Sequence, residues 1–173
     1  MKINFSNVKY GLIFSLIAIL FGGSLGLSFG CCEHSLKSYL TNQSILAMQD
    51  KYKGNQSEAD QVVRKAWIYY KRAHLHSQSM GVIGIVFSLI VVWLQFTPKI
   101  QFSVSLLSGL GSIGYGIFWL LAGSLAPGMG STGAAKDAVG FLAQISGGSF
   151  FISGAILFGF MIYKFLLSPP NKT

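Results

Sequence analysis

The chain has 173 residues, of which 51% are hydrophobic and 10% are charged, and its mean hydropathy is +0.54. Soluble domains carry about 25% charged residues, so this composition excludes an ordinary soluble protein. A formal net charge of +8 would favour nucleic acid as a partner in a soluble protein. Here the basic residues flank apolar stretches and no nucleic-acid motif is present, so nucleic acid is excluded as a partner.

The first apolar stretch, residues 10–30, reads YGLIFSLIAILFGGSLGLSFG and contains no charged side chain. A membrane-spanning helix needs roughly 20 apolar residues, because lipid offers the backbone no hydrogen-bond partner. Lys2 and Lys9 before the stretch are also typical of a signal peptide, but the apolar run is long for one. We therefore expect a retained transmembrane helix.

The connection that follows, residues 31–78, is expected to be helical and to lie outside the membrane. Its second half, SEADQVVRKAWIYYKRAHLH, begins with Ser57 as the expected N-cap and continues in helix-forming residues. Gly54 and Asn55 predict the turn before it. The first half, EHSLKSYLTNQSILAMQDKY, also tolerates helix, so both flanking spans are predicted to project from the membrane.

Three further spans are predicted at residues 79–96, 100–125 and 138–167. The linker TPK, with Pro98, predicts a tight antiparallel hairpin between the second and third spans. The segment APGMGSTGAAKD, with Pro127, predicts a loop before the fourth span, which Ser131 or Thr132 would cap. The predicted fold is all-α: one polytopic membrane domain over residues 1–173, with four transmembrane helices in an antiparallel bundle.

An even number of spans places both termini on one side of the membrane. Lysines and arginines are more numerous on the side of the long loop, but the first helix, preceded by Lys2 and Lys9, usually dominates orientation. We expect cytoplasmic termini in the plasma (inner) membrane. Aromatic residues near the span ends, among them Tyr115, Phe118 and Trp119, are predicted to anchor the helices at headgroup level.

Small residues recur at helical spacing within the spans and predict close helix packing. The sets are Ala18, Gly22, Gly26 and Gly30 in the first span, His74, Ser77, Gly81, Gly84 and Ser88 along the second, and Ser108, Ser112 and Gly116 in the third. The first set continues to His34. The pattern therefore predicts two histidines, His34 and His74, at one membrane face on neighbouring helices, with His76 facing elsewhere.

Paired imidazoles at one depth suit a haem b, and glycines beside them would leave room for the macrocycle. Arg72 and Lys136 lie at the same predicted level and would neutralise the propionates. The alternative is another metal, bound by His34, His74 and His76 with thiolates from Cys31 and Cys32. Adjacent cysteines are not expected to bond to each other, because that geometry is strained. A further alternative is that interfacial histidines simply keep a polar tip in water.

Three classes of function follow. The first is a small membrane subunit that binds haem b or a metal and serves electron transfer or assembly of a larger complex. The second is a structural or assembly subunit without a cofactor, which the uncharged spans favour. Its partners would be the lipid bilayer and other membrane subunits, or further copies of itself in a homo-oligomer. We expect no catalytic activity of its own.

The third class is an enzyme. The segment RAHLHSQS, at the start of the second span, resembles the corresponding helix start of the membrane-bound glutathione-transferase family. In that family an arginine precedes an asparagine and a glutamate. Arg72 matches the arginine, but histidine and serine stand where the other two groups are needed, so the thiol-activating chemistry of that family is not supported.

Overall fold

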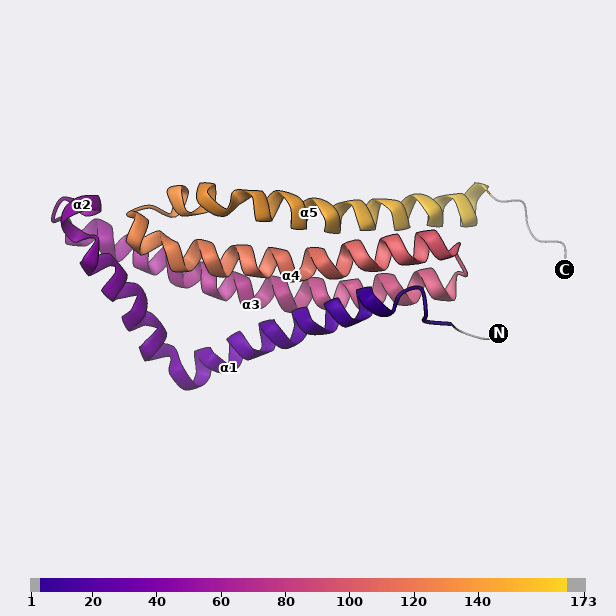
Figure 1. Cartoon of the computed structure of the whole chain (residues 1–173), viewed down its shortest axis with the longest axis horizontal. Helices are drawn as coiled ribbons and strands as arrows, with labels where there is room; N and C mark the ends of the chain where they lie inside the picture. Colours follow the sequence, from indigo (N-terminus) through magenta and orange to yellow (C-terminus); the bar gives the residue numbers. More distant parts are fainter. Residues whose placement is uncertain (1–3, 168–173) are drawn as a thin grey trace, which may run out of the picture.

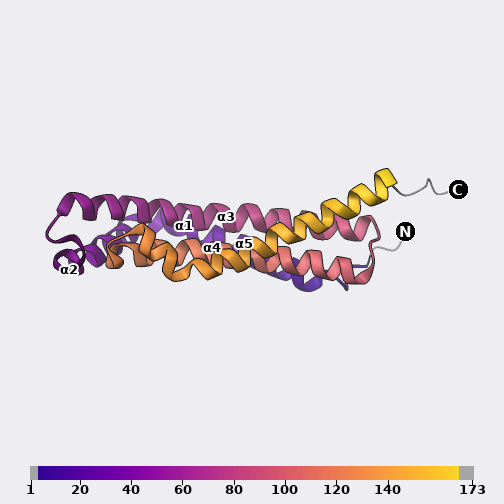
Figure 2. The same cartoon turned by 90° about the horizontal axis from the view of Figure 1, so that it is seen from above.

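The computed structural model describes residues 4–167, and this part of the chain is almost entirely helical. The elements are α1 (Lys9–Leu46), α2 (Met48–Tyr52), α3 (Gln56–Trp93), α4 (Pro98–Met129) and α5 (Thr132–Ile162), followed by a π-helical turn (Tyr163–Leu167). Helices α1, α3, α4 and α5 are long and apolar enough to cross a membrane. Successive spans run antiparallel, and both ends of the described chain lie at the same end of the molecule (Figures 1 and 2). The predicted four-span fold is confirmed.

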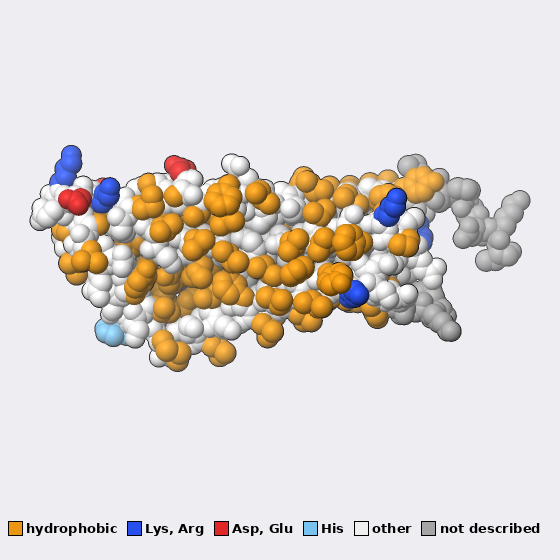
Figure 3. Space-filling view, in the orientation of Figure 1, with side chains coloured by type: hydrophobic (Ala, Val, Ile, Leu, Met, Phe, Trp, Pro, Cys, Tyr) orange, Lys and Arg blue, Asp and Glu red, His pale blue; other side chains and the backbone are white. Residues whose placement is uncertain are grey.

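The long helices extend well beyond a bilayer. Helix α3 has 38 residues, which corresponds to about 57 Å of α-helix, whereas the hydrocarbon core is about 30 Å thick. On the face shown in Figure 3, hydrophobic side chains cover the middle of the molecule, and charged side chains lie toward its two ends. The predicted helical projection of residues 31–78 is therefore confirmed, because α1 continues through its first part and α3 begins within it.

Helix ends differ from the sequence expectation in two places. The cap of α3 is Asn55, whose side chain accepts a hydrogen bond from the Glu58 amide at 3.2 Å, and not Ser57. The predicted loop between the last two spans is too long, because α4 continues through Pro127 to Met129. Gly130 ends α4 in a left-handed conformation, with a φ of 73°. A residue with a side chain would disfavour this conformation. Ser131 then caps α5, as predicted.

The membrane-spanning part consists of three mutually packed helices and a fourth that is held by one neighbour. Helices α1, α3 and α4 all contact one another, whereas α5 packs along α4 and has little contact with α3. The predicted small-residue faces of α3 and α4 are buried. These residues must be small because the helices are close together: a Cβ on Gly81 would lie 2.8 Å from the Ser15 carbonyl oxygen of α1. Most of α5 remains exposed along its length.

Helix α1 bends sharply at Cys32, whose φ of −135° and ψ of 22° are not helical. The bend gives α1 the shape of a V, with an outer arm (residues 33–46) that returns toward α3 and α4 (Figure 1). Cys31 and Cys32 are joined in a disulfide at the bend. The expectation that they would stay unpaired is wrong: successive side chains of a regular helix point about 100° apart, but the backbone here departs from that geometry.

Candidate functional site at one membrane boundary

His74 is packed into the interface between α1 and α3. Its Nδ1 lies 2.7 Å from the Gly22 carbonyl oxygen, and its ring is 5.8 Å from the Phe29 ring, centroid to centroid. A Cβ on Gly26 would lie 2.6 Å from the His74 Cε1. The space beside these glycines is therefore occupied by the imidazole itself, and is not left open for a macrocycle.

His34 lies in a different environment, although the small-residue pattern of α1 leads to it. A Cβ built on Gly30 meets no atom within 4 Å, so this face of α1 has no neighbour at that level. The bend at Cys32 follows, and His34 is exposed on the outer arm. The structure thus holds His74 in a helix interface and His34 at the surface.

His76 belongs to an aromatic cluster between α3 and α4. Its ring lies edge-on to Tyr115 at 5.1 Å and parallel to Trp119 at 6.1 Å, between centroids. The Arg72 guanidinium lies over the Trp119 ring at 4.7 Å and over the Tyr69 ring at 5.5 Å. Cation–π contacts of this kind fix the guanidinium in place. The four-residue spacing of Arg72 and His76 on one helix and of Tyr115 and Trp119 on the other places each pair on one face of its helix. The spacing does not predict that these two faces meet.

The predicted anchoring role fails for two of the aromatic residues. Phe118 and Trp119 are 4% and 9% exposed, so they belong to the protein core rather than to a headgroup belt. The Trp119 indole nitrogen is buried and has no hydrogen-bond partner in the described part of the chain. These two side chains contribute to the packing of α4 against its neighbours.

The other predicted ligands do not gather around the histidines. As a disulfide, Cys31 and Cys32 offer no thiolate to a metal. Lys136 is exposed near the start of α5. Among residues 4–167, no group of three or more His, Cys, Asp or Glu side chains is placed to hold a metal ion. A haem b or metal on His34, His74, His76, Arg72, Lys136 or the cysteines stays a prediction from the sequence, and an absorption spectrum of the purified protein would test it directly.

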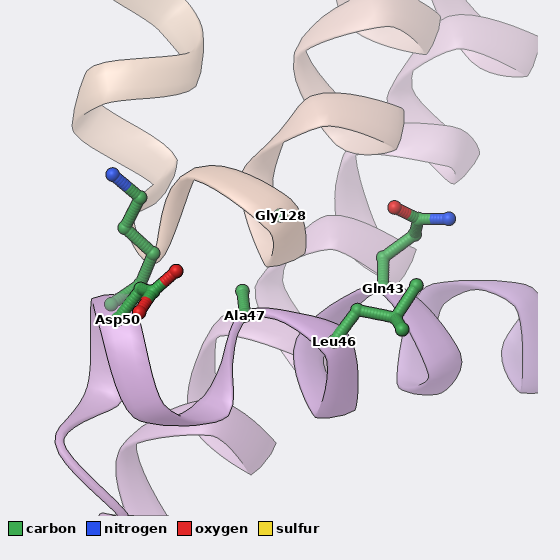
Figure 4. Close-up of a pocket in the computed structure, with 6 residues that line it drawn as sticks. Gln43, Leu46, Ala47, Asp50 and Gly128 are labelled. Atoms are coloured by element: carbon green, nitrogen blue, oxygen red, sulfur yellow. The ribbon is translucent and has the colours of Figure 1, made fainter.

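Three surface hollows are relevant to binding. The outermost, of about 240 Å³, is formed where the end of α1 and α2 meet Gly128 of α4, with Gln43 and Asp50 among its walls (Figure 4). A second, of about 380 Å³, lies between α3 and α5 and is lined by Phe87, Phe150, Phe151, Gly154, Ala155 and Phe158. A third lies between the outer arm of α1 and α3 and is strongly basic.

Comparison with known protein families, curated proteins and solved structures finds no match to this chain. A function is therefore inferred from the structure alone.

Proposed function

We propose that this protein is a structural subunit of the membrane that acts by associating with other transmembrane helices, through α5, and has no catalytic activity of its own. The observation that supports this role is the packing of α5. This helix rests on α4, leaves most of its surface exposed, and borders the phenylalanine-lined groove against α3. Such a surface is available to a further helix within the bilayer.

The exposed amide of Gln144 gives this surface a polar contact point. Gln144 lies about 10 Å along α5 from Asp137, inside the apolar part of the span. A polar side chain that faces hydrocarbon is costly, and membrane helices relieve that cost by hydrogen bonding across helix pairs. Gly140 and Gly148 lie one turn to either side, and a Cβ built on either meets no atom within 4 Å. A second backbone is therefore able to approach closely.

The partner that fits best is a second copy of the chain. A carboxamide both donates and accepts hydrogen bonds, so two Gln144 side chains are complementary to each other. A twofold axis along the membrane normal would bring both amides to the same depth, and the same surface of each copy would form the contact. A homo-oligomer is one of the partner classes predicted from the sequence.

The test is self-association in lipid. Copies labelled with donor and acceptor dyes at the amino terminus are mixed in vesicles at several protein-to-lipid ratios, and energy transfer gives the dissociation constant. Gln144→Leu is expected to raise this constant by about three- to twenty-fold. Ser24→Leu, a matched loss of an exposed polar group on α1, should leave it unchanged. Absence of transfer in the unmodified protein, or equal effects of the two variants, would contradict the proposal.

The orientation is a separate proposal: cytoplasmic termini in the plasma (inner) membrane, supported by Lys2 and Lys9 before the first span. The check is single-cysteine labelling of intact cells with an impermeant maleimide, in a background carrying Cys31→Ser and Cys32→Ser. Lys53→Cys, in the turn between α2 and α3, should react without lysis, whereas Ser6→Cys should react after lysis alone. The reverse result would place the termini outside.

A further inference from the structure

The bend in α1 creates a groove that has no role in the proposed association through α5. It has a volume of about 410 Å³ and lies between the outer arm of α1 and the projecting part of α3. Its lining residues, called here the basic groove, are Lys37, Thr41, Val63, Arg64, Trp67, Ile68 and Lys71. Without the bend at Cys32, the outer arm would not turn back toward α3.

The basic groove carries three cations and no acidic lining residue. Arg64 and Lys71 are two turns apart on the same face of α3, with Trp67 between them. Lys37 comes from the opposite wall, lies over the Trp67 ring at 5.2 Å and forms an ion pair with Glu33. Arg64 and Lys71 are both exposed and form no salt bridge with a described acidic side chain. The groove therefore has a surplus of positive charge.

The position of the groove relative to the membrane follows from α3. Lys71 and Arg72 are the last charged residues before the apolar run that extends to Trp93. Lys71 therefore lies at the boundary of the hydrocarbon region, and Arg64 lies about 10 Å farther out. The headgroup layer just outside the hydrocarbon core is about 5–8 Å thick, so Lys71 lies within this layer and Arg64 lies just beyond its outer edge.

We propose that the basic groove binds the phosphate of an anionic phospholipid headgroup from the same leaflet. The planar guanidinium of Arg64 is suited to two parallel hydrogen bonds with phosphate oxygens, and Lys71 supplies a second positive charge closer to the bilayer. Thr41 offers a hydroxyl donor. Trp67 and Ile68 form an apolar wall that suits the glycerol and upper acyl part of a lipid.

A soluble phosphate compound would use the same cations, but it would leave the apolar wall of the groove uncovered. A lipid satisfies both parts, and its headgroup is held at the depth of Lys71 by the bilayer itself. Anionic headgroups are attracted by basic side chains at the membrane surface at about 1 kcal/mol per side chain. The groove places three such side chains around one space.

The experiment measures which lipids stay bound. Protein is purified from bilayers that contain equal amounts of phosphatidylglycerol and phosphatidylcholine, and native mass spectrometry counts the retained lipids. The unmodified protein should retain phosphatidylglycerol preferentially. The double variant Arg64→Gln with Lys71→Gln should reduce that preference by about 30-fold. The matched control, Lys65→Gln with Lys53→Gln, removes two exposed charges outside the groove and should retain the preference.

Two further measurements keep the outcomes distinct. Circular dichroism melts of both double variants should match the unmodified protein, because all four side chains are exposed; the single variants Arg64→Gln and Lys71→Gln serve if the double variant unfolds. Delipidated protein is also titrated with inorganic phosphate. Equal loss of preference in both double variants, or no loss in the groove variant, overturns the proposal. If inorganic phosphate binds in an Arg64-dependent manner and no lipid preference is found, the groove binds a soluble phosphate compound and the lipid proposal is wrong.

Discussion

Gly22 lies where the backbones of α1 and α3 are in close contact, beside His74. A Cβ there would lie 2.9 Å from the His74 carbonyl oxygen and 3.0 Å from the Gln78 amide nitrogen, both backbone atoms that cannot rotate away. We predict that Gly22→Ala lowers the free energy of unfolding in micelles by about 1–3 kcal/mol, measured by titration with a denaturing detergent. Gly30→Ala, where a Cβ meets nothing, is the control and should show no loss. Equal behaviour of the two variants would mean that α1 does not pack on α3 as described.

Tyr52 connects α2 to the end of α4. Its side chain is 1% exposed, and its hydroxyl donates a hydrogen bond to the Pro127 carbonyl oxygen at 2.7 Å. Tyr52→Phe should lower the free energy of unfolding by about 1 kcal/mol, whereas Tyr39→Phe, on a side chain that is 46% exposed, should leave it unchanged. Thermal melts of the two variants in micelles compare them directly.

The stability contributed by the Tyr52 hydroxyl should depend on pH. Burial, and to a smaller degree the nearby Glu58 carboxylate, raises the pKa of Tyr52 above its ordinary value of 10.0. A raised pKa in the folded state means that the bond contributes its full stability below pH 10.0 and loses it as the pH rises through the higher value. The difference in melting temperature between the unmodified protein and Tyr52→Phe should therefore be constant at neutral pH and shrink in strong alkali. A difference that grows with pH would contradict this assignment.

At the scale of elements, the bend in α1 contains two cysteines that are exposed and bonded to each other. Cys31 and Cys32 form a disulfide in the structure, so unreduced protein should not react with a maleimide. After reduction by a phosphine, two maleimide groups should be added per chain, because both residues are exposed. Intact-protein mass spectrometry counts the additions. Two additions without reduction would show that the sulfurs are free thiols.

Element types and spans were predictable from the sequence, whereas the course of α1 was not. Uncharged runs of 20 or more residues indicate membrane-spanning helices. Small residues at four-residue spacing indicate close packing between helices, as at Gly22 and Gly81. The residues around Cys32 are compatible with helix on both sides, so local preference alone does not mark the bend. Pairing of His34 with His74 requires a straight α1, whereas the helix bends at Cys32, before His34. The cluster around His76 depends on two helices meeting in register, which periodicity within one helix cannot supply.

At the scale of the whole molecule, the region outside the membrane is a rigid extension of the spans and not a flexible loop. The helical structure of this region is interrupted at the turn after α2, where Lys53 and Gly54 have φ values of 51° and 79°. Proteases need an extended backbone, so limited trypsin treatment should cut first after Lys53 and give two fragments resolvable by mass. Lys65 and Lys71 are also exposed, but they lie within α3 and should be cut much later. Early cleavage at those two sites would mean that α3 begins at the membrane surface and does not extend beyond it.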